Sequence, residues 1–381
     1  MTLRSVQHDN VREHNRFAVL ETLRELHSAT RAELARYTAL SVPTVTTIVA
    51  ELSALGVVAD GDPAPSAGGR PARQHHLVAN ARNVLALDLS GRHPRHGSVD
   101  LLGSLTEQRE APEIELGHGA TGGLLGRLID WTNARIAAEE AAGNPVSALA
   151  VAVPGVVDPA SGRVRLAPAL GWSDEPLGDL LQEATGLPVM LENDVNAGAL
   201  GELRHGAALG GRNVLYLSLG SGVGASLVIN GELYRGANGA AGELGYSLLP
   251  GLPEAGLDLG DSGPFERHLL GIANGFLVNG EVNLGTTERR WAFDHLVEKL
   301  RMALHNLACV LDPELIVVAW AADPAGLLAR ALGARWVAPL PVNIVAGSLG
   351  ASAALHGVGH LALGRLTAGL CGLETGEWSG L

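Results

Sequence analysis

The spacing of the apolar residues changes near residue 80, and this change limits the possible folds more than any other feature. Before it, apolar residues recur every three or four positions, as in amphipathic helices. From Asn83 onward, short apolar runs alternate with glycine turns, a pattern typical of β-strands. Because the two patterns favour different packing, we expect two structural units, residues 1–80 and residues 81–381.

The distribution of charge supports the same division. The formal net charge of the whole chain is −13, which argues against a nucleic-acid partner because such proteins are usually basic. Residues 1–80, however, contain eight arginines and eight acidic residues, so their formal charge is zero. All of the acidic excess therefore belongs to residues 81–381, and the first unit is free to bind DNA.

Three helices are expected in the first unit. The second opens at Thr30, and Glu33 three positions later completes a capping box. The third follows Ser41 as its N-cap, has Pro43 in its first turn and ends at Gly56. The first is predicted to bury Phe17, Leu20, Leu23 and Leu26, and the third Val42, Val45, Val49, Leu52 and Leu55.

A glycine- and proline-rich segment, 61–71, and an extended segment, 75–78, follow these helices. Helix, helix, turn, helix and β-wing is the order of a winged helix-turn-helix. The exposed start of the third helix could contact base edges or thymine methyl groups in a major groove, and Arg70 at the wing tip could enter a minor groove. The candidate groove residues are Ser41, Pro43, Thr44, Thr46 and Thr47. A three-helix bundle with a solvated threonine face is the alternative.

The second unit is predicted to alternate strands and helices. Strands are expected at 84–89, 98–102, 148–153, 189–191, 214–219, 225–229 and 315–319, and helices at 122–140 and 297–310. Gly220, Gly222 and Ala225 fit a dinucleotide-binding pattern, but a strand follows them where that motif requires a helix. We therefore expect a glycine turn between antiparallel strands, which either binds a phosphate or forms a plain hairpin.

No targeting or redox signal stands out. The two cysteines, Cys309 and Cys371, are far apart and give neither a disulfide framework nor metal-type spacing. Residues 1–15 lack the apolar core of a secretory signal, and no run reaches the 18 apolar residues of a membrane span. We therefore expect a cytoplasmic protein with no membrane partner.

Several short motifs occur in one order along the chain: Gly69-Arg-Pro71, Gly171-Trp172, Glu192-Asn-Asp-Val-Asn196, Gly220-Ser-Gly-Val-Gly224, Gly231-Glu-Leu-Tyr-Arg-Gly-Ala-Asn238, Ala241-Gly-Glu-Leu-Gly245 and Asp312-Pro-Glu314. In this set the chain resembles the ROK family (repressor, open reading frame, kinase), on the branch with an N-terminal winged helix. The resemblance implies an α/β fold in which a winged helix-turn-helix at 1–80 precedes a two-lobed, actin-like domain (sugar kinase and Hsp70 type) at 81–381. That domain would sense a ligand and form homodimers or homotetramers.

The resemblance also implies a sugar site. Asn193 and Asp194 match the family's sugar-contacting pair, and Asp194 stands at the position of the base in the family's kinases. Glu243 matches a sugar-binding glutamate, and Glu266 lies about where the family has another. Tyr246 occupies the position of a histidine that binds zinc in the family. Surface exposure or helix capping is the alternative role of these carboxylates.

Other positions depart from the family pattern. The zinc-binding cysteine run is replaced by a segment whose only candidate ligands are Asp258 and Asp261, so we expect no zinc and no other cofactor. The first phosphate loop carries Ser90 and Arg92 in place of glycine and threonine, and Trp320 starts the segment where a glycine pair is usual. Ala169 also replaces an asparagine. A loop of this kind is poorly suited to holding ATP phosphates, so we expect no catalytic residue and no kinase activity.

Three functions remain under consideration. The favoured one is a transcription regulator, a repressor of carbohydrate-related genes, that binds double-stranded operator DNA and is controlled by a sugar or sugar derivative between its lobes. The second is a DNA-binding protein whose degenerate actin-like domain serves only for dimerisation. The third is an ATP-dependent sugar kinase.

Overall fold

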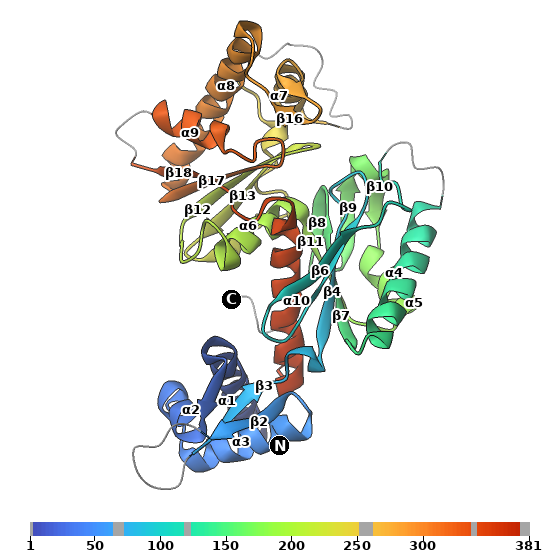
Figure 1. The fold of residues 1–381 in the computed structure, drawn as a ribbon, viewed down its shortest axis with the longest axis vertical. Helices are drawn as coiled ribbons and strands as arrows, with labels where there is room; N and C mark the ends of the chain where they lie inside the picture. The colour runs from blue at the N-terminus through green and yellow to red at the C-terminus, as the bar shows by residue number, and fades with distance from the viewer. Residues whose placement is uncertain (1–2, 64–71, 118–122, 251–261, 337–340, 374–381) are drawn as a thin grey trace.

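The computed structural model describes residues 3–63, 72–117, 123–250, 262–336 and 341–373, arranged as a winged helix and two larger α/β lobes. The winged helix lies at one end of the molecule, and the last helix of the chain, α10 (Ala353–Cys371), runs from the lobes down to it (Figure 1). Among these residues, no helix has both the length and the apolar character required to cross a membrane.

The predicted winged helix-turn-helix is confirmed. It consists of α1 (Leu3–Leu26), β1 (Ser28–Thr30), α2 (Arg31–Thr38), α3 (Val42–Ala54), β2 (Val58–Pro63) and β3 (Arg73–Leu77). The strands form an antiparallel sheet in the order β1-β3-β2. Thr30 and Glu33 form the expected capping box on α2, and the Ser41 side chain accepts a hydrogen bond from the Thr44 N–H at the start of α3.

Two predicted core positions of α3 are wrong. Val42 is 48% exposed and Leu55 is 44% exposed, whereas Val45, Ile48, Val49 and Leu52 are buried. Val42 is the first residue of the helix and Leu55 its C-terminal cap, so neither faces α1 and α2. Strand β1 was also missed, because its three residues give no period of their own and pair with β3 only in the folded chain.

The N-terminal lobe is built on a five-stranded sheet in the order β11-β7-β4-β5-β6. Helices α4 (Leu124–Ala141) and α5 (Leu177–Thr185) cover one face and α10 the other (Figure 1). The strands are β4 (Asn83–Asp88), β5 (Arg95–Val99), β6 (Leu105–Glu110), β7 (Val146–Val153) and β11 (Val189–Asn193). A smaller antiparallel sheet contains β8 (Val156–Asp158), β9 (Arg163–Ala167) and β10 (Trp172–Glu175).

The C-terminal lobe repeats this topology. Its sheet has the order β14-β13-β12-β17-β18, so in both lobes the first strand is central, the second and third follow it on one side by antiparallel pairing, and the fourth and fifth lie parallel on the other. The strands are β12 (Val214–Leu219), β13 (Val223–Ile229), β14 (Glu232–Tyr234), β17 (Leu315–Trp320) and β18 (Asn343–Ala346). The duplicated order is that of the expected two-lobed, actin-like domain.

Helices α7 (Pro264–Ala273), α8 (Thr287–Leu311) and α9 (Leu327–Ala334) gather on one side of the C-terminal sheet, and α6 (Asp194–His205) lies on the other (Figure 1). A short hairpin, β15 (Leu277–Val278) and β16 (Glu281–Val282), follows α7. The chain also has four 3-10 turns, η1 (Ala79–Ala81), η2 (Pro168–Leu170), η3 (Leu244–Tyr246) and η4 (Gly350–Ser352), within the described residues.

Helices α6 and α10 cross between the lobes with their backbones in contact. Each has a glycine at the crossing: a Cβ on Gly357 would lie 1.7 Å from the Ala197 carbonyl oxygen, and one on Gly201 would lie 2.1 Å from that of Ala353. No side chain fits at either position. Because α6 packs on the C-terminal sheet and α10 on the N-terminal sheet, this crossing joins the two lobes.

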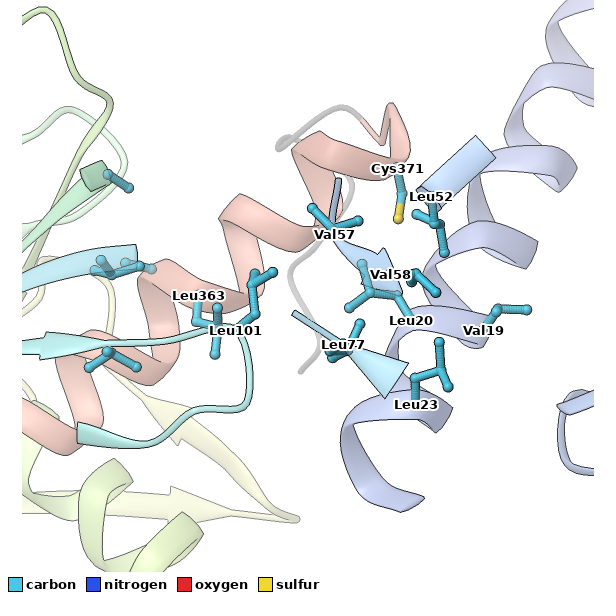
Figure 2. Close-up of a cluster of buried hydrophobic side chains, with 14 of the residues drawn as sticks. Val19, Leu20, Leu23, Leu52, Val57, Val58, Leu77, Leu101, Leu363 and Cys371 are labelled. Atoms are coloured by element: carbon cyan, nitrogen blue, oxygen red, sulfur yellow. The ribbon is translucent and has the colours of Figure 1, made fainter. Parts of the chain in front are cut away.

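The winged helix shares one hydrophobic core with the N-terminal lobe and α10. Leu101, from the loop between β5 and β6, and Leu363 and Cys371 of α10 belong to the same cluster as the buried residues of the winged helix (Figure 2). The winged-helix residues labelled there are Val19, Leu20, Leu23, Leu52, Val57, Val58 and Leu77. The Arg24 Nε donates to the Leu101 carbonyl oxygen at 2.8 Å. This continuous core fixes the winged helix to α10.

Candidate functional site

Asn193 and Asp194 stand where β11 ends and α6 begins. Asn193 is the N-cap of α6, and its Oδ1 accepts the Asn196 N–H at 2.9 Å. Its Nδ2 donates to the Gly155 carbonyl oxygen at 2.8 Å and to the Asp194 Oδ1 at 3.2 Å. The helix cap and these two bonds fix the direction of the amide, so the Asp194 carboxyl is held in place by its neighbour.

Four carboxyl groups from the two lobes influence one another around Asp194. Burial, then the nearby Asp88 and Glu243 carboxyls, raises the pKa of Asp194 to about 7. Burial also raises the pKa of Asp88, which ends β4 and is 2% exposed. The pKa of Glu243 is raised by burial and then by Glu266. In the sequence, Asp88 stands just before Ser90 and Arg92 of the altered phosphate loop, and only the fold brings it beside Asp194.

Glu266 has a structural contact of its own. It lies in the first turn of α7, and its Oε2 accepts the Val223 N–H at 2.9 Å. A Cβ on Gly222 would lie 2.9 Å from the same oxygen, so glycine is what lets the carboxyl reach the turn between β12 and β13. One oxygen of Glu266 therefore holds this turn, while burial raises the pKa of the carboxyl.

Tyr246 ends the 3-10 turn η3, which begins directly after Glu243, and its N–H donates to the Glu243 carbonyl oxygen at 3.2 Å. In the described part of the chain, no group of three histidine, cysteine or carboxylate side chains could hold a metal ion. Asp258 and Asp261 lie outside the described residues. The residues present around Glu243 thus do not form the thiolate donor set of the family's zinc site, and the absence of zinc stays a prediction.

The two glycine-containing loops that would face a nucleotide are in direct contact. The Ser221 Oγ, in the C-terminal lobe, donates to the Ser90 carbonyl oxygen in the N-terminal lobe at 3.2 Å. Arg92 is exposed and binds Glu115 through its Nε at 3.0 Å and its Nη2 at 2.9 Å. A phosphate placed between these loops would first have to separate them. The register of β12 and β13 confirms the predicted turn at 220–222.

A buried ion pair beside Asn193 was missed by sequence analysis. Glu192, on β11, is 1% exposed, and its Oε2 accepts the Arg235 Nε at 2.9 Å and Nη2 at 2.7 Å. Its Oε1 accepts the Asn193 N–H at 3.0 Å and the Asn196 Nδ2 at 3.1 Å. Both partners lie inside recognised motifs, but 43 residues separate them. Only the fold shows that the two motifs meet.

The other candidate interface is the N-terminal end of α3. Ser41, Pro43 and Thr47 are exposed, and Thr44 and Thr46 are partly exposed. The Thr46 hydroxyl donates to the Val42 carbonyl oxygen at 2.8 Å and the Thr47 hydroxyl to that of Pro43 at 3.2 Å. The Ser41 and Thr44 hydroxyls lie 2.8 Å apart and bond to each other. Arg70 lies outside the described residues, so its predicted place at the wing tip stays a prediction.

Residues 41–50 contain no arginine, lysine, asparagine or glutamine. The nearest acidic side chain, Glu51, is held by Arg12 and by the Arg16 Nε at 2.7 Å. Because arginine and lysine usually recognise guanine, and asparagine and glutamine usually recognise adenine, α3 lacks the common donors for purine recognition. Its outward face consists of methyl groups and hydroxyl oxygens.

The structure has two α/β lobes of the same topology, joined by the crossing of α6 and α10, and both lobes contribute carboxyl groups near Asp194. A winged helix packs on α10. These features define a sugar-kinase-like domain joined to a DNA-binding module. Comparison with known proteins agrees. The ROK family model matches residues 126–263. The glucokinase of Halalkalibacterium halodurans is 30% identical over 275 residues, covering 64% of this chain and 82% of the enzyme. The chain therefore belongs to the ROK family.

Two further known proteins align with a larger share of the chain. The xylose repressor of Caldicellulosiruptor bescii is 25% identical over 337 residues, covering 82% of this chain and 84% of the repressor. The solved structure of a ROK family transcriptional regulator, a homologue of the E. coli MLC protein, superposes with a TM-score of 0.73 at 20% identity, covering 95% of this chain and 98% of that one. The predicted fold, winged helix included, is confirmed by this superposition.

Proposed function

We propose that the protein is a transcriptional repressor that binds operator DNA through its winged helix and responds to a sugar bound near Asp194. One observation carries this proposal: Asp194 starts α6, α6 crosses α10 in backbone contact, and α10 shares a core with the winged helix. A change at the sugar-facing residues therefore reaches the DNA-binding unit through packed elements. The similarity to the xylose repressor named above supports the same function.

The expected mechanism is a shift between two arrangements of the lobes. A sugar that binds one arrangement more tightly increases its population, by no more than the difference in binding free energy. Because the winged helix is fixed to α10, the rearrangement changes the position of α3 in each subunit. In a homodimer or homotetramer this alters the spacing of two α3 helices, and operator affinity changes with it.

The contacts of α3 indicate what it recognises. The hydroxyl hydrogens of Thr46 and Thr47 are already donated to carbonyl oxygens of the helix, so their methyl groups and oxygen lone pairs are what remain for DNA. Methyl groups pack against the thymine methyl, and a hydroxyl oxygen accepts from the cytosine or adenine amino group. We infer that operator half-sites carry thymines opposite the start of α3.

Selection of bound sequences from a random DNA library by the full-length protein tests this function. Recovery of one symmetric sequence is expected, and recovery of none would contradict operator binding. Thr46→Val keeps the methyl and removes the hydroxyl, whereas Thr46→Ser does the reverse. We expect Thr46→Val to keep most of the affinity and Thr46→Ser to lose about 1 kcal/mol or more, as should replacing the facing thymines by deoxyuridine. The opposite order would show that the hydroxyl is what contacts the base.

Sugar phosphorylation is the second candidate activity, favoured by one observation. A carboxyl with a pKa of about 7, as at Asp194, suits a general base at neutral pH. The contact between Ser221 and Ser90 and the pairing of Arg92 with Glu115 count against ATP binding. We propose that the protein is not a kinase. Calorimetry with ATP and Mg²⁺ tests this: measurable binding, with phosphate transfer lost in Asp194→Asn, would establish the kinase instead.

A domain that binds no sugar and serves only for dimerisation is the remaining alternative. The carboxyls of Asp88, Asp194, Glu243 and Glu266 favour a ligand, because raised pKa values near one another are typical of functional sites. A thermal-shift screen over a sugar library separates the two, since a ligand at a hundred times its Kd stabilises by about 2.7 kcal/mol. A flat screen would favour the ligand-free scaffold.

A further inference from the structure

The ion pair between Arg235 and Glu192 joins the two lobes. Glu192 is on β11, in the sheet of the N-terminal lobe, and Arg235 directly follows β14, the edge strand of the C-terminal sheet. The Arg235 Nε and Nη2 both bind one carboxylate oxygen, at 2.9 and 2.7 Å. The Glu192 side chain is 2% exposed and that of Arg235 35%, so the carboxylate is inside the protein while the guanidinium reaches the surface.

The segment that follows Arg235 is anchored to both lobes. We call residues 235–243 the strap. A Cβ on Gly239 would lie 2.5 Å from the Val157 carbonyl oxygen, so the strap rests against β8 of the N-terminal lobe. At its other end the Gly242 carbonyl oxygen accepts the Ala225 N–H of β13 at 2.8 Å. The strap ends at Glu243, a sugar-site candidate. One short segment therefore links Glu192 to Glu243.

The second oxygen of Glu192 holds the other half of the candidate site. It accepts from the Asn193 backbone N–H and from the Asn196 side chain, while Asn196 N–H bonds to the Asn193 amide oxygen. A buried carboxylate is costly unless it is both paired and hydrogen-bonded. Arg235 supplies the hydrogen-bonded pairing charge, and Arg365 is a second cation that interacts with the carboxylate. Loss of the hydrogen-bonded cation should therefore weaken the hold of Glu192 on Asn193 and Asn196.

We propose that Arg235 is a positioning residue that holds the turn at 192–196 from the opposite lobe, so that Asp194 and Glu243 are brought together before any sugar binds. This inference rests on the proposed function only for the identity of the ligand. The positioning itself is a property of the free protein, and it is tested in the free protein.

Hydrogen exchange and interlobe distance are the two measurements. The first follows the backbone amides of Asn193 and Asn196 by NMR in the full chain. The second uses spin labels on exposed Cys309 of α8 and on a Glu140→Cys variant at the end of α4, which is also exposed. Arg235→Gln should accelerate exchange at both amides by at least roughly tenfold and broaden the distance distribution, because it removes the cation that is hydrogen-bonded to the buried Glu192 carboxylate.

The matched variants separate positioning from general damage. Arg163→Gln breaks an exposed pair with Asp174 within the N-terminal lobe and should change neither measurement. Adding Glu192→Gln to Arg235→Gln removes the unpaired charge and should return exchange most of the way toward wild type. Arg235→Lys keeps the charge but loses one of the two guanidinium hydrogen bonds to Glu192. Its exchange rates and the width of its distance distribution should lie between those of wild type and Arg235→Gln.

Either of two results overturns the proposal. One is wild-type exchange and wild-type interlobe distances in folded Arg235→Gln. The other is a double variant that is as perturbed as the single one, since damage that does not depend on the Glu192 charge is not positioning through the pair. Failure of the wild-type protein to bind DNA or any sugar would contradict the proposed function and leave these two measurements intact as tests of the strap.

Discussion

At the scale of single residues, the clearest consequence of the fold is the electrostatic state of Asp194. Its neighbours Asp88 and Glu243 come from opposite lobes, and all three carboxyls are at least partly buried. The sequence could identify Asp194 through its motif, because Glu192–Asn196 is contiguous. It could not place Asp88 beside it, since only the parallel pairing of β4 with β7, and of β7 with β11, brings their ends together.

Asp194→Asn should stabilise the protein at high pH and not at low pH. The folded-state pKa of about 7 lies above the ordinary value, so the folded protein holds a proton that the unfolded chain releases, and stability falls as pH rises through this window toward about 7. A difference of one between the folded and unfolded pKa corresponds to about 1.4 kcal/mol. Thermal unfolding at pH 5 and pH 8 checks this: Asp194→Asn should unfold several degrees above wild type at pH 8 and by a clearly smaller margin at pH 5, because pH 5 lies between the unfolded and folded pKa values and only part of the destabilisation is present there. Equal differences at both pH values would contradict the raised pKa.

The ion pair of Glu192 and Arg235 shows the same limit of sequence reasoning. Each residue lies in a recognised motif, yet nothing local indicates that a glutamate and an arginine 43 positions apart bind one another. The caps of α2 and α3 are the opposite case. The capping hydrogen bonds of Thr30, Glu33 and Ser41 join residues only three positions apart. The sequence therefore predicts these caps, and the structure confirms them.

At the scale of elements, helix caps give a prediction for α3. The Ser41 Oγ accepts the Thr44 N–H at 3.2 Å, and its loss leaves that donor without a partner from the helix. Ser41→Ala should lower the free energy of unfolding by about 1 kcal/mol. Ser53→Ala, at an exposed position near the end of the same helix, is the control and should be neutral or slightly stabilising. Urea unfolding of the free protein measures both, and equal effects would show that the cap carries no stability.

The crossing of α6 and α10 gives a sharper prediction. Gly357→Ala would place a methyl group 1.7 Å from the Ala197 carbonyl oxygen, so the helices must separate. We expect Gly357→Ala to lower the free energy of unfolding by about 3 kcal/mol or more, because backbone atoms cannot move aside as the end of a side chain can. Gly364→Ala, on α10 with nothing within 4 Å, should instead stabilise by about 0.5–1 kcal/mol through helix propensity.

Thermal unfolding of the two glycine variants distinguishes these expectations. A Gly357→Ala protein as stable as wild type would show that the helices are not in backbone contact. The sequence contains both glycines, but it gives no sign of which one lies at a crossing. That information depends on α10 packing against an element more than 150 residues earlier in the chain.

Strand predictions succeeded where a strand is a continuous apolar run and failed elsewhere. The strand expected at 98–102 is instead β5 (Arg95–Val99), which is buried but begins with the polar residues Arg95 and His96. Strands β4, β7, β12 and β17 are continuous apolar runs and were predicted to within a few residues. Strand β6 (Leu105–Glu110) is mostly exposed, so it shows no apolar run, and it was missed. Helix α8 starts ten residues before its predicted first residue, because its N-terminal turns carry the charged residues Glu288, Arg289 and Arg290 in place of a core stripe.

At the scale of the whole molecule, the account depends on the attachment of the winged helix to α10. Leu101 is fully buried in the shared core, and its carbonyl oxygen accepts the Arg24 guanidinium. Leu101→Ala should lower the free energy of unfolding by about 2–5 kcal/mol and weaken the packing of the winged helix against the lobes. Limited proteolysis should then cut the chain faster near residues 79–82, where the two units join.

The matched variant for this junction is Leu166→Ala, on β9 of the N-terminal lobe. Leu166 is 43% exposed, so its truncation should leave the cutting rate near 79–82 unchanged. Accelerated cutting in both variants, or in neither, would contradict a shared core.

The distribution of charge also bears on how the whole molecule binds DNA. The neutral winged helix gives little non-specific attraction to DNA, so operator binding must depend on groove contacts made by more than one subunit.

The most direct test of the central claim is the affinity of the full-length protein for its selected operator, measured by fluorescence anisotropy with and without D-xylose, D-glucose and a panel of related sugars. The account predicts that at least one sugar weakens operator binding by about 5- to 150-fold, the usual range for coupled sites, and that Asp194→Asn and Glu243→Gln bind the operator normally but lose this response. Tight operator binding that no sugar changes, or a full response in both variants, would contradict it.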